Sequence, residues 1–133
     1  MTSDLKGKTA IVTGAGRGLG REYAQKFAAA RANVVAGNVL DYADTVAAIK
    51  AAGSDAISVP LDVRDQASCD TMAEQAMASF GRIDVLVNNA ALYGSLNGGR
   101  FDNLPELDWN DCMDVNVNGI WRCCKAVIAP MQA

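Results

Sequence analysis

The feature that most constrains the fold is the segment 9–20, T-A-I-V-T-G-A-G-R-G-L-G, in which a short apolar run leads into four glycines. An apolar run bounded by glycine is typical of a buried strand, and the apolar spacing of residues 21–30 is typical of an amphipathic helix. A strand, a glycine turn and a helix form a cradle for phosphate, because glycine lacks the Cβ that would keep backbone N–H groups away from an anion at the positive end of the helix dipole. The segment therefore predicts a dinucleotide site. A plain structural turn is the alternative for the glycines by themselves.

The glycine spacing separates this segment from two other phosphate-binding loops. The G-x-G-x-x-G fingerprint fails, because the glycine that follows Gly16 and Gly18 is Gly20, one place out of register. A Walker loop fails because residues 7–9, G-K-T, have no glycine five residues upstream and precede a strand. The pattern that matches is T-G-x-x-x-G-x-G, and its members are Thr13, Gly14, Gly18 and Gly20.

Strand-like and helix-like segments alternate along the rest of the chain. The expected strands are residues 32–36, 56–59 and 83–87, and the expected helices are residues 41–52, 65–80 and 106–131. Alternation at these lengths indicates repeated right-handed βαβ crossovers. We therefore expect an α/β fold, a doubly wound parallel sheet of the Rossmann type with helices on both faces, in one domain over residues 1–133. Residues 92–104 are expected to form a long loop.

Composition excludes several classes of protein. A net charge of -3 over 133 residues argues against nucleic acid as a partner, and no apolar stretch has the length of a signal peptide core or a membrane span, so we expect a cytoplasmic protein. The absence of histidine excludes Ser-His-Asp and Cys-His hydrolases. Four cysteines without C-x-x-C spacing make a poor zinc site, so we expect ordinary thiols and no metal.

Four motifs in order, T-G-A-G-R-G-L-G, L-D-V, N-N-A-A and N-V-N-G, resemble those of the classical short-chain dehydrogenases/reductases over the whole chain. The resemblance implies a Rossmann sheet of strand order 3-2-1-4 and an NAD(P)-dependent oxidoreductase that transfers hydride between a cofactor and a small secondary alcohol or ketone. The cofactor contacts that it implies are Thr13, Gly14, Arg17, Gly18, Leu19, Gly20, Asn38, Asp62, Val63, Asn89 and Ala90.

The resemblance places Asn38 where the second strand ends and where the family reads the adenosine ribose. An aspartate there would select NAD, and a basic residue would pair with the 2′-phosphate of NADP. Asn38 does neither decisively, while Arg17 could attract that phosphate and Asp41 could repel it. We therefore expect either NAD or NADP as the cofactor, with NAD slightly favoured. The alternative for Asn38 is a residue that satisfies a turn.

Three further positions have two interpretations each. The resemblance implies that Asp62 accepts a hydrogen bond from the adenine amino group and that Val63 lies beside the adenine ring. The alternative is that Asp62 caps the helix that follows. Asn89 of N-N-A-A would border the cofactor or brace strand ends, and Ala91 replaces the family's glycine. Asn116 matches the active-site asparagine, and it could instead be a helix-bend residue, since Asn and Gly near it favour a local distortion.

The catalytic serine and Tyr-x-x-x-Lys pair of the family have no match in this sequence. Tyr23, Tyr42 and Tyr93 each lack a lysine four residues on, and Tyr93 is interpreted as a packing residue of its loop. We therefore expect the N-terminal half of such an enzyme, inactive by itself, with homo-oligomers in the full-length form. Strand 83–87 would be an exposed apolar edge that leaves the chain prone to aggregate. The alternatives are a non-catalytic nucleotide-binding or dimerising module and, less well supported by the motifs, a methyltransferase that binds S-adenosylmethionine.

Overall fold

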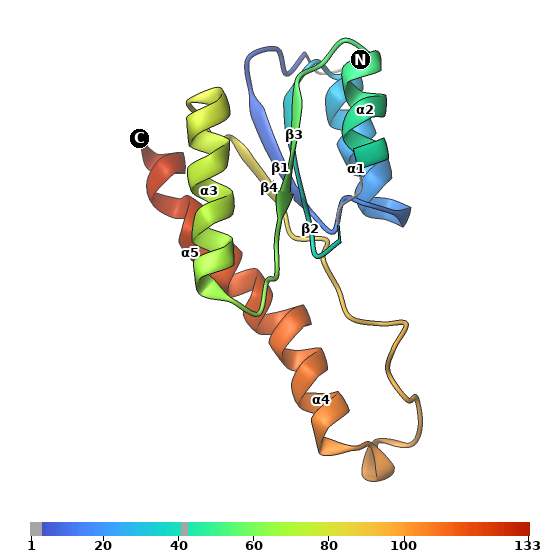
Figure 1. Cartoon of the computed structure of the whole chain (residues 1–133). Coiled ribbons are helices and arrows are strands. Elements are labelled where there is room, and N and C mark those ends of the chain that lie inside the picture. Colours follow the sequence, from blue (N-terminus) through green and yellow to red (C-terminus); the bar gives the residue numbers. More distant parts are fainter. Residues whose placement is uncertain (1–3, 41–42) are drawn as a thin grey trace.

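The computed structural model describes residues 4–40 and 43–133, which form a four-stranded parallel sheet with helices on both faces (Figure 1). The strands run in the order β3-β2-β1-β4, and their bounds are β1 Thr9–Thr13, β2 Asn33–Asn38, β3 Ala56–Pro60 and β4 Val85–Val87. The helices are α1 Gly18–Ala29, α2 Ala43–Ala51, α3 Gln66–Phe80, α4 Glu106–Met113 and α5 Gly119–Gln132. The predicted doubly wound parallel sheet is confirmed.

Alternation along the strands divides the core between the two faces. Ile11 and Val35 belong to the cluster that α3 and α5 cover, whereas Val12 and Val34 belong to the cluster that α1 and α2 cover. Parallel strands that are covered on both faces have continuous apolar sequences. In agreement with this, all five residues of β1 are buried. The central strand thus holds the two halves of the core together.

The ends of α3 show why that helix begins and ends where it does. Asp65 caps it, since its side chain accepts a hydrogen bond from the N–H of Ala67, and Gly81 ends it in the left-handed conformation with a φ of 72°. Asp62 is therefore not the capping residue, and that interpretation is wrong. The predicted start of the second helix at Asp41 falls outside the described residues.

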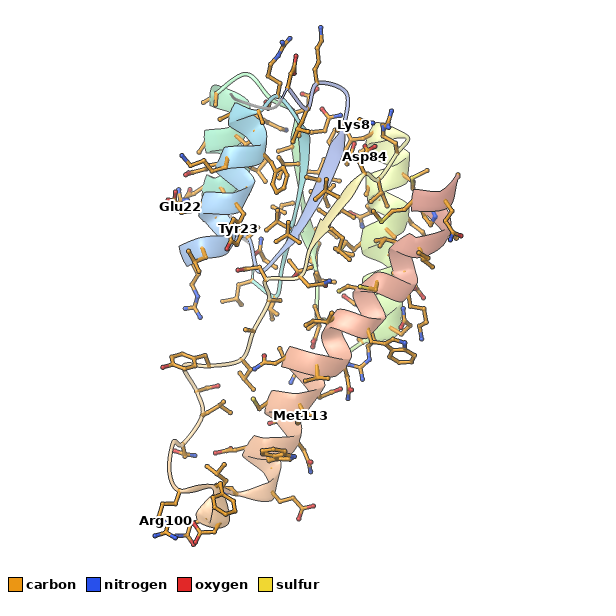
Figure 2. The ribbon with its side chains drawn as sticks, turned by 180° about the vertical axis from the view of Figure 1, so that it is seen from behind. Lys8, Glu22, Tyr23, Asp84, Arg100 and Met113 are labelled. Atoms are coloured by element: carbon orange, nitrogen blue, oxygen red, sulfur yellow. The ribbon has the colours of Figure 1, made fainter. Side chains whose placement is uncertain are left out.

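The strand β4 is shorter than predicted and pairs with β1 alone among the described residues. The carboxylate of Asp84, just before it, accepts a hydrogen bond from the N–H of Thr9 at 2.9 Å, and the N–H of Asp84 donates to the carbonyl of Thr9 at 2.9 Å. Lys8 and Arg82 also pair with Asp84, and Figure 2 shows Lys8 and Asp84 together at the amino ends of β1 and β4. The predicted apolar edge strand is present, but its three residues are half-buried and not exposed.

The helices α4 and α5 form one long rod interrupted by a π-helical turn, Asp114–Asn118, and the α4 end of the rod extends beyond the sheet (Figure 1). This turn confirms the local distortion predicted around Asn116. The thiols of Cys69 and Cys123 meet where α3 packs on α5, with 3.7 Å between their sulfur atoms, and both cysteines are free. None of the described helices combines the length and apolar character needed to cross a membrane.

Candidate functional site

A cavity of about 790 Å³ lies at the carboxyl edge of the sheet, where the segments that follow all four strands meet. The chain leaves β1 toward α1 on one face and leaves β4 toward the rod of α4 and α5, so this is the point where the direction of winding reverses. Open α/β sheets bind ligands at such a switch point, and this volume is typical of small-molecule sites. Its lining residues are Gly14, Gly16, Arg17, Gly18, Leu19, Gly20, Asn38, Val39, Leu40, Leu61, Asp62, Val63, Arg64, Asn89, Ala90, Ala91, Leu92, Tyr93 and Val115.

The glycine segment forms one wall because no side chain fits between it and β4. Gly14 has a φ of +68°, and its N–H donates to the carbonyl of Gly37 at 2.7 Å. A Cβ on Gly20 would collide with the carbonyl of Gly14 and the side-chain amide of Asn89. Arg17, the residue before α1, makes no capping hydrogen bond among the described residues, so the first turn of α1 has no side-chain cap for its N–H groups. The wall has the features of an anion cradle.

Thr13 and Asn89 fasten this wall to the end of β4. The Thr13 hydroxyl accepts hydrogen bonds from the N–H groups of Asn89 and Ala90 at 3.0 and 2.9 Å. In return, the Asn89 side-chain amide donates to the carbonyls of Thr13 and Gly14 at 3.1 and 3.2 Å. Of the two interpretations of Asn89, bracing of strand ends accounts for these bonds, and the residue borders the cavity as well.

Asn38 lies in the cavity wall with its polar side chain only 4% exposed. Its carbonyl accepts from the N–H of Leu61 at 2.8 Å, but its side-chain Nδ2 has no hydrogen-bond partner among the described residues. This bond continues the pairing of β2 with β3 and does not involve the side-chain amide. An unpaired buried donor costs about 1–3 kcal/mol, and a ligand hydroxyl or carbonyl would remove that cost.

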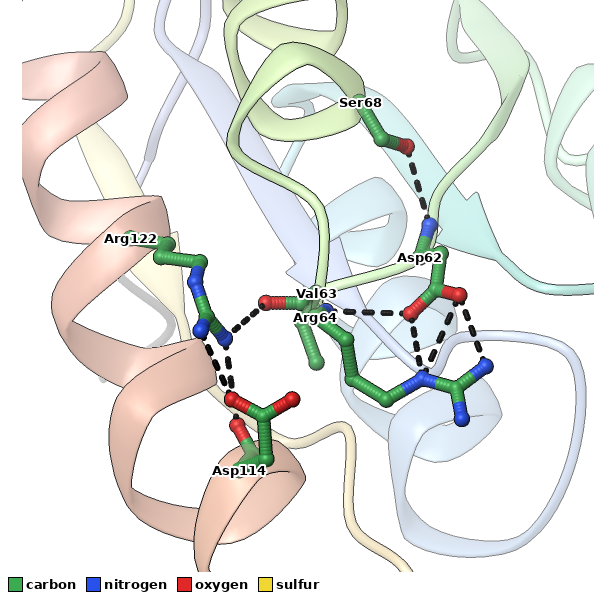
Figure 3. Close-up of polar contacts among 6 residues, drawn as sticks. All are labelled: Asp62, Val63, Arg64, Ser68, Asp114 and Arg122. Carbon is green, nitrogen blue, oxygen red and sulfur yellow. Dashed lines mark hydrogen bonds and ion pairs between the residues drawn. The ribbon is translucent and has the colours of Figure 1, made fainter. Parts of the chain in front are cut away.

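Asp62 is held by an arginine two residues on, a partner that sequence reasoning missed (Figure 3). Arg64 Nη2 lies 2.8 Å from Asp62 Oδ2, and Arg64 Nε lies 3.0 Å from Oδ1. The hydrogen bond from Arg64 lowers the pKa of the Asp62 carboxyl group. The N–H of Asp62 donates to the Ser68 hydroxyl at 2.9 Å, which ties the loop to α3. The signal for this pair in the sequence is an arginine two residues after the aspartate, in the order D-x-R.

Asn116 stands behind the cavity wall and does not line it. Its Oδ1 accepts from the N–H of Leu92 at 2.7 Å, and its Nδ2 donates to the carbonyl of Leu92 at 3.1 Å and to Cys112 Sγ at 3.3 Å. Leu92 does line the cavity. The amide therefore fixes the loop after β4, which agrees with a structural role for the bend.

The cavity collects most of the residues predicted from sequence. Gly14, Arg17, Gly18, Leu19, Gly20, Asn38, Asp62, Val63, Asn89 and Ala90 line it, whereas Thr13 and Asn116 act from behind. Tyr93 is 88% exposed at the cavity mouth, so the interpretation of it as a packing residue is wrong. Within the described residues, no group of three His, Cys, Asp or Glu side chains could hold a metal ion.

Sequence comparison gives one family. The family model described as short chain dehydrogenase matches residues 8–133. The 3beta-hydroxysteroid dehydrogenase 1 of Eggerthella lenta is 39% identical over 131 residues, which are 96% of this chain and 49% of that protein. The 3-alpha-(or 20-beta)-hydroxysteroid dehydrogenase of Mycobacterium tuberculosis H37Rv is 36% identical over 132 residues, 99% of this chain and 49% of that protein.

Solved structures agree with the sequence matches. The carveol dehydrogenase of Mycobacterium avium in complex with NAD superposes with a TM-score of 0.91 at 25% identity, covering 98% of this chain and 51% of that one. A short chain dehydrogenase/reductase of Burkholderia phymatum in complex with NAD gives a TM-score of 0.89 at 33% identity, covering 96% and 45%. The chain thus spans about half the length of these relatives.

Proposed function

Because the chain belongs to the short-chain dehydrogenase family, we propose that its cavity binds a nicotinamide dinucleotide, as the cofactor-binding part of an oxidoreductase acting on a secondary alcohol or ketone. The bound cofactor would supply hydride transfer to or from the substrate carbon. NAD is present in the neighbouring structures from Mycobacterium avium and Burkholderia phymatum, which supports this choice of ligand.

The observation that carries the proposal is that one cavity is lined by Gly14 and Gly20, where a side chain does not fit, and by Asn38, whose buried Nδ2 has no partner among the described residues. The wall offers backbone N–H groups near the amino end of α1, where a pyrophosphate is favoured. Asn38 would then hydrogen-bond a ribose hydroxyl, and Asp62 and Val63 would border the adenine. Asn89 and Ala90 would border the nicotinamide riboside. Every residue in this assignment lines the cavity.

The proposal favours NAD over NADP because of the charges at the ribose end. Asn38 is neutral and almost fully buried, so it offers no positive charge to a 2′-phosphate. Arg17, an exposed cation on the cavity wall, could attract a 2′-phosphate, whereas Arg64 is already paired with Asp62. We expect Arg17→Ala to weaken NADP more than NAD, and Asn38→Asp to weaken NADP because it adds a carboxylate. Calorimetric titration of both variants with both nucleotides checks this preference.

We further propose that residues 1–133 correspond to the N-terminal half of the family's domain and bind cofactor without turning it over. Two observations support this: the chain spans about half of its relatives, and no tyrosine in it is followed four residues later by lysine. Asn116 would position the loop at Leu92 beside the reacting groups. Direct catalysis by its amide would require that both Leu92 hydrogen bonds be released.

The test is a titration of the chain with NAD, NADP and S-adenosylmethionine, followed by an assay with NAD and a panel of secondary alcohols. Binding of a nicotinamide nucleotide without turnover is the expected result. No uptake at millimolar nucleotide would overturn the cofactor assignment, and preferential binding of S-adenosylmethionine would favour a methyltransferase. Turnover of any alcohol would overturn the proposal that this chain is inactive.

A dimerising module is the second candidate, and the exposed apolar side chains of the rod favour it. Five of the large apolar residues on α4, the π-helical turn and α5 are 42–61% exposed, and they are Trp109, Val117, Ile120, Trp121 and Ile128. Apolar surfaces of this kind mark interaction sites. We propose that another copy of the chain covers them, and the two candidate functions are compatible.

A further inference from the structure

A single arginine on α5 joins the cavity wall to the π-helical turn (Figure 3). Arg122 Nη1 donates to the carbonyl of Val63 at 3.2 Å and to the carbonyl of Asp114 at 3.3 Å, and Nη2 donates to Asp114 Oδ1 at 2.6 Å. The Arg122 side chain is only 18% exposed, so water competes weakly for these acceptors. One guanidinium therefore holds two segments that are about fifty residues apart in the sequence.

On the cavity side, the bond to Val63 fixes the peptide between Val63 and Arg64. Both residues line the cavity, at the end where we place the adenine. Gly119 contacts Val63 closely, since a Cβ there would lie 2.6 Å from Val63 Cγ2, and Gln66 Nε2 donates to the carbonyl of Arg122 at 3.4 Å. The start of α5 is thus docked against this loop through both backbone and side chains.

On the other side, Arg122 holds the π-helical turn. The carbonyl of Asp114 accepts the N–H of Gly119, five residues on, and it is this same carbonyl that receives Arg122 Nη1. The hydrogen bond from Arg122 also lowers the pKa of the Asp114 carboxyl group, so the pair is charged at neutral pH. The turn is thus a firm support for the guanidinium. The bonds between Asn116 and Leu92 do not involve Arg122.

We propose that Arg122 is a positioning residue for the nucleotide: by bracing the Val63 carbonyl against the π-helical turn, it sets the adenine-side wall of the cavity. This inference rests on the proposed function. Its specific consequence is an asymmetry between the two halves of the cofactor. Losing Arg122 should weaken ligands that use the Val63 wall and spare ligands that use only the loop at Leu92.

The experiment measures the dissociation constants of NAD, AMP and nicotinamide mononucleotide for the unsubstituted chain and its variants. We expect Arg122→Met to weaken AMP and NAD about tenfold and nicotinamide mononucleotide less than about twofold, since one charge-assisted bond to the wall is lost. Arg122→Lys should recover part of the loss, because an ammonium can reach one acceptor but not three. In the double variant with Asp114→Asn, the loss should be no greater than with Arg122→Met alone.

The matched control is Arg82→Met. Arg82 also pairs with an aspartate, at 2.6 Å, but the pair lies before β4, at the end of the sheet opposite the cavity. This variant removes an Arg–Asp pair from the fold without touching the cavity, and we expect unchanged affinity for all three ligands.

The outcomes separate the inference from the function on which it depends. Unchanged AMP affinity in Arg122→Met, or equal losses of AMP and nicotinamide mononucleotide, would overturn positioning by Arg122 while leaving the cofactor site intact. Failure of the unsubstituted chain to bind NAD would overturn the proposed function and the inference with it. If Arg122→Met does not fold, Arg122→Lys and Asp114→Asn are measured instead. Faster hydrogen exchange in residues 61–66 of these variants supports the inference, and unaltered exchange there contradicts it.

Discussion

At the scale of residues, the site depends on the absence of a side chain at Gly20 as much as on the side chains around it. Because Gly20 has no Cβ, α1 approaches the Gly14 carbonyl after β1 closely, and Gly20 itself lines the cavity. One added methyl group has no space there. The same residue thus serves the packing of the fold and the shape of the cavity.

We expect Gly20→Ala to destabilise the fold by about 1–3 kcal/mol, because the added Cβ must displace backbone. Binding of NAD should also be lost, since the glycine wall must move. Chemical denaturation and nucleotide titration measure the two effects. Gly98→Ala is the control, because nothing lies within 4 Å of a Cβ at Gly98, and a comparable loss in that variant would refute the steric explanation.

The Thr13 hydroxyl is the second residue for which a substitution is informative. It accepts two backbone N–H groups, and residue Thr13 is 1% exposed. Thr13→Val would remove this acceptor from both groups and leave the N–H of Ala90 without it, whereas the N–H of Asn89 also donates to the carbonyl of Val87 at 3.1 Å. We expect a loss of about 1–3 kcal/mol in the free energy of unfolding, measured by urea denaturation. Thr13→Ser keeps the hydroxyl and should retain most of the stability; equal losses in the two variants would show that the hydroxyl is not responsible.

At the scale of elements, Asp84 joins β1 to β4 at their amino ends through three partners, the N–H of Thr9 and the side chains of Lys8 and Arg82. The hydrogen bond from Arg82 is the main cause that lowers the pKa of Asp84 from 3.8 to about 2. The folded state therefore binds this proton more weakly than the unfolded state. The resulting stabilisation is complete above the unfolded pKa and is lost as the pH falls through the folded one.

We expect Asp84→Asn to cost about 1–3 kcal/mol at pH 7, because the charge-assisted bonds are weakened. The difference between the two proteins should shrink as the pH falls from about 4 to about 2. Urea denaturation across this range is the measurement. A difference that stays constant down to pH 2 would show that the charge of Asp84 does not stabilise the fold.

Elements and their order were predictable from sequence because periodicity and caps are local signals. The apolar run of β1, the glycine after α3 and the distortion around Asn116 all fall where the sequence placed them. Side-chain partners were not predictable in the same way. Arg122 and Val63 are 59 residues apart, and Asn116 and Leu92 are 24 apart, so only the packing of helix on sheet brings them together. The capping role predicted for Asp62 is wrong because Asp65, three residues on, caps α3, while Asp62 pairs with Arg64.

At the scale of the whole molecule, the described residues leave two apolar surfaces uncovered. The edge strand β4 pairs on one side, and the rod of α4 and α5 exposes Trp109 and Trp121 by 56% and 61%. Exposed edges and apolar faces favour association between chains. These two features together make self-association the expected state.

We expect the chain to sediment as a dimer or larger species at micromolar concentration. Trp121→Glu should shift the population toward monomer, because it places a charge in the apolar face, whereas Phe101→Glu, in the exposed short helix Phe101–Asn103 outside the rod, should not. Analytical ultracentrifugation measures both. A cooperative melt of a monomeric, unsubstituted chain would contradict the prediction.

The π-helical turn determines how the rod would respond to the loss of one residue. A π-helical turn holds one residue more than an α-helical turn, and each residue rotates an α-helix by about 100°. Because the widened turn absorbs this residue, deleting one residue between Asp114 and Asn118 would restore a regular helix and leave Cys123 and Val127 facing α3. Loss of the extra residue would therefore alter the turn itself, where Asp114 and Asn116 make their hydrogen bonds, and would spare the packing of α5 on α3.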